Sequence, residues 1–87
     1  MSRPRRRVLI VAQEIELRAR IARVLQSAGH VVELAGSRTR ALELAAGKKI
    51  DAAIVVHSDE LNGFGQELRE QVPRTIILNH RTDKIRR

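Results

Sequence analysis

Short apolar runs alternate with longer segments of helical periodicity along this chain. Four runs consist largely of aliphatic and β-branched residues, at positions 8–11, 31–35, 52–56 and 75–78. Continuous apolar runs of this length are typical of strands that are buried on both faces of a sheet. We therefore expect four buried strands.

The first intervening segment, residues 14–28, predicts an amphipathic helix. Its apolar residues recur at helical spacing, and Arg18, Arg20 and Arg23 lie on the other sides. The expected inward face consists of Leu17, Ile21, Val24, Leu25 and Ala28. Gly29 follows directly and supplies a C-terminal stop.

Two further segments predict shorter helices. Ser37 is the expected N-cap of the second helix, which ends at Gly47. Its inward face should consist of Ala41, Leu42, Leu44 and Ala45. A third helix is expected over residues 66–72, and Pro73 closes it.

The alternation of strands and helices predicts an α/β fold. Strands joined by helices favour a parallel sheet with right-handed crossovers and helices on both faces. In such sheets ligands bind just outside the carboxyl ends of the strands. The candidate site is therefore made of the residues that follow the four strands: Ala12 and Gln13, Gly36 and Ser37, Val56 to Asp59, and Asn79 with His80.

Length and composition narrow the class of protein. The chain has 87 residues, enough for one domain, and Phe64 is its only aromatic residue, so the core must be aliphatic. Cysteine is absent, which excludes disulfides and thiolate metal sites and fits a reducing compartment. No apolar run approaches the ~20 residues that span a bilayer, and charge resumes at Glu14, so no signal-peptide pattern is present. A cytoplasmic protein that does not bind membranes is therefore expected.

The net charge of +7 is concentrated in two tails. Residues 1–7 carry +4 and residues 81–87 carry +3, whereas residues 8–80 have equal numbers of basic and acidic side chains. Such tails can bind nucleic acid or acidic lipid without specificity, or can be solvated ends. The body of the chain has no overall basic character.

Taken in order, the segments resemble the receiver domain of bacterial response regulators. VLIV and EIELR are similar to its first strand and first helix, and AGHVVELA to its second strand. ALELA and IDAAIVV are similar to its second helix and third strand, and GFGQEL and TIILNH to its third helix and fourth strand. The resemblance implies a flavodoxin-like, receiver-like domain over residues 8–80 with strand order 2-1-3-4. The fifth β/α unit of complete receivers is missing from this sequence.

The resemblance fails at the positions that carry the family's phosphorylation chemistry. Active receivers place two Mg²⁺-binding acids after the first strand, where this chain has Ala12 and Gln13. The phosphoacceptor aspartate corresponds to Val56, or to His57 after a one-residue shift, and the switch Ser/Thr corresponds to Asn79. The family's lysine ends the missing fifth strand. We expect a degenerate phosphorylation site that holds no metal or cofactor.

This combination implies a pseudo-receiver, because the framework is kept while the reactive residues are replaced. Relatives of this kind are non-enzymatic modules of two-component or phosphorelay signal transduction. They act by protein–protein interaction with a partner or with a fused output domain. The sequence names neither the partner nor the signal.

Local features leave some chemistry open. His57, Asp59 and Glu60 lie together after the third strand, where they could bind a metal or accept phosphate, and Asp59 could be a displaced phosphoacceptor. A solvated loop is the simpler interpretation. The stretch 62–65 (NGFG) lacks the Lys and Ser/Thr of a phosphate-binding loop, so we expect a turn with Phe64 packed beneath it.

Two further expectations concern partners. With strand order 2-1-3-4 the outer edge of the fourth strand is unpaired, which favours a homodimer through that edge or a marginally stable monomer. The alternative function is a small basic nucleic-acid-binding protein that uses its Arg-rich tails. Against specific recognition, the chain has neither a helix-turn-helix pattern nor an aromatic platform. An enzyme that uses His57 and Asp59 has the least support.

Overall fold

A computed structural model describes residues 6–79 and contains every predicted strand and helix. The elements are β1 (Arg7–Val11), α1 (Ile15–Ser27), β2 (Val31–Ala35), α2 (Arg38–Gly47), β3 (Ala52–Val56), α3 (Phe64–Arg69) and β4 (Thr75–Leu78). The expectations for His80 and for the two charged tails concern residues that lie wholly or largely outside the described part of the chain. No helix in the described part of the chain is both long and apolar enough to cross a membrane.

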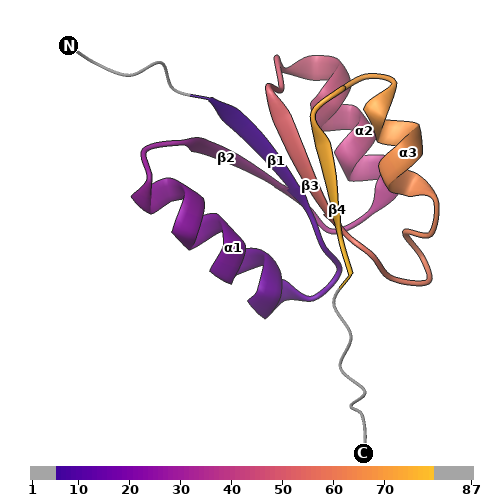
Figure 1. The fold of residues 1–87 in the computed structure, drawn as a ribbon, viewed down its shortest axis with the longest axis horizontal. Helices are drawn as coiled ribbons and strands as arrows, with labels where there is room; N and C mark the ends of the chain where they lie inside the picture. Colours follow the sequence, from indigo (N-terminus) through magenta and orange to yellow (C-terminus); the bar gives the residue numbers. More distant parts are fainter. Residues whose placement is uncertain (1–5, 80–87) are drawn as a thin grey trace, which may run out of the picture.

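The four strands form one parallel sheet in the order β2-β1-β3-β4, which confirms the predicted order. The register aligns Val11 with Ala35 on one side and with Val55 on the other, and Val56 with Leu78. Helix α1 lies on one face of the sheet, and α2 and α3 lie on the other (Figure 1). The domain is therefore a three-layer, flavodoxin-like fold.

The predicted ends of the first two helices are confirmed. Gly29 follows α1 with φ +93°, a left-handed conformation that glycine adopts without steric cost. Ser37 caps α2, because its side chain accepts a hydrogen bond of 3.2 Å from the Arg40 N–H. Helix α2 ends at Gly47, as expected.

The predicted bounds of the third helix were wrong. Helix α3 begins at Phe64, directly after Gly63, which turns the chain with φ +78°. Gly65 lies inside the helix, where a Cβ would overlap the side chain of Ile77 on β4. Val72 lies beyond the helix, and its carbonyl accepts a hydrogen bond of 2.6 Å from the buried Thr75 hydroxyl.

The sheet divides the buried side chains into two clusters. The larger cluster lies under α2 and α3 and includes Leu9, Val55 and Leu68 around Phe64, all of them almost fully buried. The smaller cluster lies under α1 and contains only Val8, Ile10 and Ala22 as buried residues. One face of the sheet is therefore much better covered than the other.

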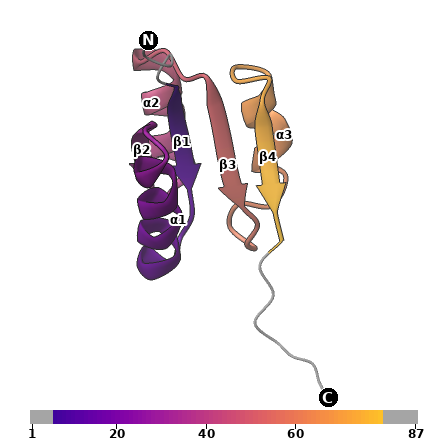
Figure 2. The same ribbon diagram turned by 60° about the vertical axis from the view of Figure 1, so that its left-hand side comes forward.

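The expectation that every strand is buried on both faces was wrong for β4. Helix α1 contacts β1 and β2, and no described helix lies over β4 on that side (Figure 2), while Ile54 of β3 packs at the edge of the smaller cluster. Ile76 and Leu78 of β4 are consequently 56% and 41% exposed. Two residues of the predicted inner face of α1, Val24 and Ala28, are exposed for the same reason.

Candidate functional site: the carboxyl edge of the sheet

The corner between β1 and α1 is closed by backbone hydrogen bonds. Ala12 is fully buried, and its N–H donates to the Ala35 carbonyl at 3.1 Å. Its own carbonyl oxygen accepts a hydrogen bond of 2.7 Å from Nη1 of Arg18. A residue with no polar side-chain atom thus occupies a position that solvent does not reach.

Gln13, the next residue, is exposed and points across the edge of the sheet. Its side-chain amide donates a hydrogen bond to the carboxylate of Glu60, which lies on the loop between β3 and α3. Its nitrogen is therefore already bound, and its remaining oxygen is a single neutral ligand. This pair joins two loops that are 47 positions apart in the sequence.

The other predicted site residues follow β3 and β4. Val56 is the last residue of β3, 6% exposed and paired with Leu78 in the register. His57 is exposed, and its backbone N–H donates to the Leu78 carbonyl at 2.7 Å. Asn79 is also exposed. The sheet therefore brings these positions to one edge, but without a carboxylate at the end of β3.

The acidic residues of the loop after β3 do not assemble a metal site. Among residues 6–79 no group of three or more His, Cys, Asp or Glu side chains is placed to hold a metal ion. Asp59 and Glu60 are exposed, and Ser58 uses its hydroxyl to accept from the Leu61 N–H at 3.3 Å. This geometry fits the interpretation of a solvated loop.

Arg18 is a site residue that the sequence pattern placed wrongly. It was expected on an outer side of α1, yet it is half-buried and reaches back over the β1–α1 corner. A Cβ at Gly36 would lie only 2.7 Å from Arg18 Nη1, so the absence of a side chain at Gly36 makes room for the guanidinium. A cation at this corner repels a divalent metal ion, which favours neutral or anionic groups instead.

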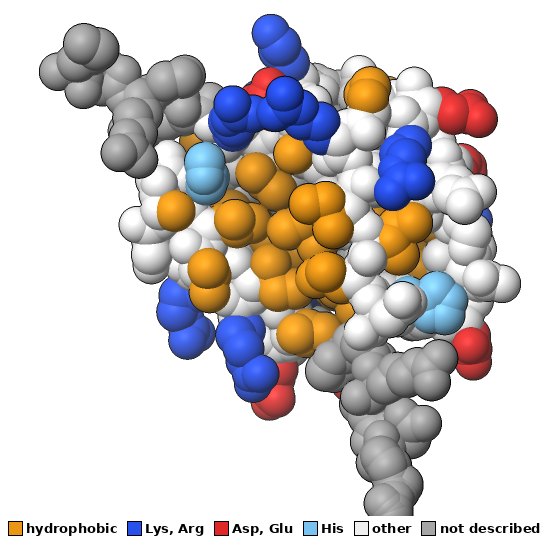
Figure 3. Space-filling model, viewed as in Figure 1, with side chains coloured by type: hydrophobic (Ala, Val, Ile, Leu, Met, Phe, Trp, Pro, Cys, Tyr) orange, Lys and Arg blue, Asp and Glu red, His pale blue; other side chains and the backbone are white. Residues whose placement is uncertain are grey.

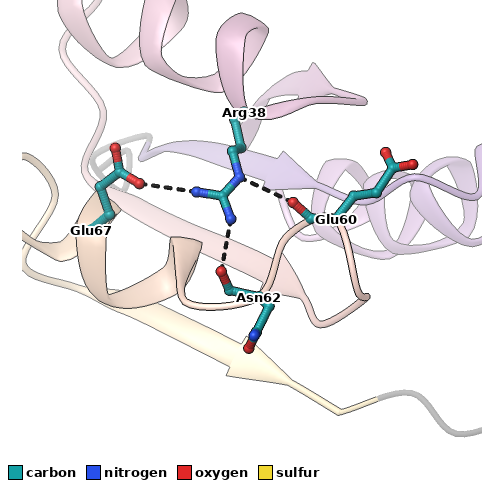
Figure 4. A network of polar contacts seen from close by, with 4 residues as sticks. All are labelled: Arg38, Glu60, Asn62 and Glu67. Atoms are coloured by element: carbon teal, nitrogen blue, oxygen red, sulfur yellow. Dashed lines mark hydrogen bonds and ion pairs between the residues drawn. The ribbon is translucent and has the colours of Figure 1, made fainter.

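Arg38, at the start of α2, holds the loop after β3 (Figure 4). Its guanidinium donates to the backbone carbonyls of Glu60 at 3.0 Å and Asn62 at 2.7 Å, and to the Glu67 carboxylate at 3.2 Å. It also lies 5.5 Å from the centre of the Phe64 ring, within the range of a cation–π contact. One side chain thus fixes the turn, the first residue of α3 and the edge of the core.

Replacing Arg38 with methionine should loosen this loop while keeping the aliphatic stem. We expect a loss of about 1–2 kcal/mol in the free energy of unfolding, because the carbonyls of Glu60 and Asn62 lose a charged donor. Hydrogen exchange of the amides in residues 57–63 should become faster.

Arg40→Met is the matched control. Arg40 forms an exposed ion pair with Glu43 at 3.3 Å on the same helix, and its loss should cost less than about 0.5 kcal/mol. Equal effects of the two substitutions on stability and on exchange would show that Arg38 does not order the loop.

Neither arginine could be found from motif positions. Arg18 and Arg38 both act through backbone carbonyls, which sequence patterns do not reveal. The available signal was weaker: an arginine in the first turns of each helix lies near the edge where the preceding strand ends. Together with the Gln13–Glu60 pair, they tie the edge by hydrogen bonds.

The fold has a counterpart among solved structures. The signal receiver domain of an HD domain-containing protein from Pseudomonas fluorescens Pf-5 matches this chain with a TM-score of 0.78 at 24% sequence identity. The match covers 92% of this chain and 68% of that chain. No protein-family model and no curated protein matches the sequence. The likeness in shape, at this identity, establishes a receiver-like fold.

Proposed function

We propose that this protein is a receiver-like signal-transduction module that is not phosphorylated and that acts by binding another protein or a fused output domain. The observation that carries the proposal is the burial and hydrogen bonding of Ala12 at the β1–α1 corner. The alanine there is fully buried, and an arginine guanidinium lies 2.7 Å from its carbonyl oxygen.

Physical chemistry supports the loss of phosphoryl transfer. Mg²⁺ requires oxygen ligands, usually carboxylates, and the two residues that follow β1 are Ala12, which has no ligand atom, and Gln13, whose neutral amide is bound to Glu60. Val56 has no atom that can form an acyl phosphate. Asn79 retains a polar side chain, but a switch residue has no role where no phosphoryl group forms.

The retained framework supports an interaction role. The aliphatic core, the helix caps and the Arg38 contacts all stabilise the fold, so the domain is kept as a scaffold. A scaffold without a reactive group can transmit a signal only through what binds its surfaces. We therefore propose a role in two-component or phosphorelay signalling in bacteria, without catalysis and in the cytoplasm.

The direct chemical test is incubation with acetyl phosphate and Mg²⁺, followed by intact-mass measurement. We expect no protein that carries a phosphoryl group. A phosphoryl group located on His57 or Asp59 would contradict the proposal. It would favour the alternative that one of these residues is a displaced phosphoacceptor.

The homodimer stays a separate proposal, based on the outer edge of β4. Within residues 6–79, β4 pairs only with β3, and Arg69 Nε already donates to the Thr75 carbonyl at 3.1 Å. Because this contact already occupies one carbonyl group of β4, fewer backbone groups are free to pair with a second copy. We therefore expect weak, concentration-dependent dimers in sedimentation velocity. A strictly monomeric protein at millimolar concentration would rule out pairing through this edge.

A further inference from the structure

A small cavity opens at the amino end of the sheet, the end opposite to the candidate site described above. Its volume is about 330 Å³, and it is lined by Arg7, Val31, Lys49 and Asp51. Arg7 and Val31 are the first residues of β1 and β2, while Lys49 and Asp51 lie on the loop between α2 and β3. Binding sites for small molecules have volumes of about 300–1,000 Å³, so this cavity suits a ligand at the small end of that range.

The walls of the cavity are joined by backbone hydrogen bonds. The Asp51 N–H donates to the Arg7 carbonyl at 2.8 Å, and Oδ2 of Asp51 accepts from the Arg7 N–H at 2.8 Å. On the other side, Arg7 is paired with Val31 in the register of the sheet. These contacts hold the α2–β3 loop against the start of β1, so the cavity is formed before any ligand binds.

The guanidinium of Arg7 lacks an acceptor. Its Nε is buried and has no hydrogen-bond partner among residues 6–79. The Glu33 carboxylate lies 3.6 Å from this nitrogen, close enough for an ion pair but too far for a hydrogen bond. A buried N–H without a partner costs free energy. An additional oxygen atom from a ligand would therefore be bound favourably here.

The charges around the cavity are positive on balance. Three cations, Arg7, Lys48 and Lys49, lie near two carboxylates, Glu33 and Asp51. Lys48 Nζ is 3.9 Å from Glu33, and Lys49 forms no ion pair with another of residues 6–79. Lys and Arg side chains gather, with an acidic side chain among them, at the end of the molecule where β1 and β3 begin (Figure 3). This balance favours an anionic ligand over a cation.

Asp51 and Val31 indicate what else the ligand contains. Oδ2 of Asp51 is used by the Arg7 N–H, and no other hydrogen bond to this carboxylate occurs within residues 6–79. Its second oxygen can accept from a hydroxyl group, which also separates the carboxylate from the charge of the ligand. Val31 offers an apolar surface for a short carbon skeleton.

We propose that this cavity binds a small organic anion, in which a phosphate or carboxylate group lies next to a hydroxyl group. The oxyanion accepts hydrogen bonds from Arg7 and Lys49, and the hydroxyl donates to Asp51. Arginine pairs well with either oxyanion, because its donors match the spacing of two oxygens. Such a ligand bridges β1 and the α2–β3 loop, far from the edge that carries the degenerate phosphorylation site. The inference goes beyond the proposed function and does not rest on it.

The test is an NMR titration of the whole protein with glycerol 3-phosphate and, separately, with glycerate. Uncharged glycerol is the control ligand. We expect saturable amide shifts at Val31, Lys49 and Asp51 with at least one of the two anions, and none with glycerol. Because the cavity is open to solvent, the dissociation constant should be on the order of 1 mM and should rise with salt. The anion that binds more tightly identifies the preferred group as phosphate or carboxylate.

Three variants locate the binding site. Lys49→Met should weaken binding about fivefold, and Arg7→Met about tenfold, because each removes a charged donor. Lys49 is exposed on a loop, so its replacement should leave the circular dichroism spectrum unchanged even if Arg7→Met lowers stability. Arg40→Met is the matched control: it also removes one positive charge, but at the first turn of α2, and it should bind as the wild type does.

Several results would overturn the inference. The first is the absence of saturable shifts with both anions, and the second is an equal response to glycerol. The third is an equal loss of binding in Lys49→Met and Arg40→Met, which would show only general attraction to the net charge of +7. The fourth is a set of shifts confined to Ala12 and Gln13 at the opposite edge. None of these results concerns acyl phosphate formation, so this inference and the proposed loss of phosphoryl chemistry fail independently.

Discussion

Replacing Phe64 with alanine is expected to lower the free energy of unfolding by about 3–5 kcal/mol. Phe64 is fully buried at the start of α3, and it is the largest fully buried side chain in the described part of the chain. It packs in the larger cluster with residues of β1, β3 and α3. The substitution leaves a cavity in that cluster and also removes the ring that Arg38 contacts.

A loss of this size is a large share of the total stability, which for a domain of this length is of order 5–10 kcal/mol. Urea unfolding followed by far-ultraviolet circular dichroism measures it, since the chain has neither tryptophan nor tyrosine for fluorescence. Leu78→Ala is the control: this side chain is 41% exposed, and its truncation should cost less than about 1 kcal/mol. A Phe64→Ala loss below that of the control would contradict the packing described above.

Ala12→Asp should be the more damaging of the two substitutions that place an acid directly after β1. Ala12 is fully buried and hydrogen-bonded through its backbone at 3.1 Å to Ala35. A carboxylate at this position would be desolvated, and we expect a loss of about 3 kcal/mol in the free energy of unfolding. The buried corner is therefore expected to tolerate alanine but not a carboxylate.

Gln13→Asp is the matched control for this prediction. Gln13 is exposed, so an acid there should cost no more than about 1 kcal/mol, mainly from loss of the hydrogen bond to Glu60 and from repulsion between the two acids. Thermal unfolding of both variants at neutral pH compares them directly. If Ala12→Asp were as stable as Gln13→Asp, Ala12 would be accessible to water and an acid there would be tolerated.

The sequence was sufficient to predict the strands, the first two helices and a parallel sheet because these signals are local, whereas the strand order came from the resemblance to receiver domains. The strands are short aliphatic runs, Ser37 and Gly29 mark helix ends, and alternation of strands with helices favours a parallel sheet. The start of α3 could not be predicted, because both Gly63 and Gly65 suit a turn. Only the packing of Gly65 against Ile77 of a later strand separates their roles.

Burial on the α1 face was harder to predict. Periodicity identified the apolar flank of α1, but it cannot show how many strands one helix covers. Val24 and Ile76 are large aliphatic residues of the kind that usually lie in a core. They are nevertheless 65% and 56% exposed, because no described element lies over them. An apolar residue in such a pattern indicates that its side chain is more stable when it is buried. The pattern does not indicate which element or which chain buries it.

The candidate site was predictable in position but not in its contacts. The carboxyl ends of parallel strands meet at one edge, so Ala12, Val56 and Asn79 were expected there, and the register places them there. The guanidinium contacts of Arg18 and Arg38 depend on long side chains that reach backbone carbonyls. Such contacts leave no periodic signal in a sequence.

The most direct test of the central claim is a titration with beryllofluoride and Mg²⁺, followed by amide NMR shifts. Beryllofluoride binds an aspartate that can be phosphorylated and mimics its acyl phosphate, so a receptive site responds at the carboxyl edge of the sheet. We predict no saturable shifts at Ala12, Val56 or Asn79. Saturable shifts there, or around Asp59, would show that the phosphorylation site still functions and would contradict the proposed function.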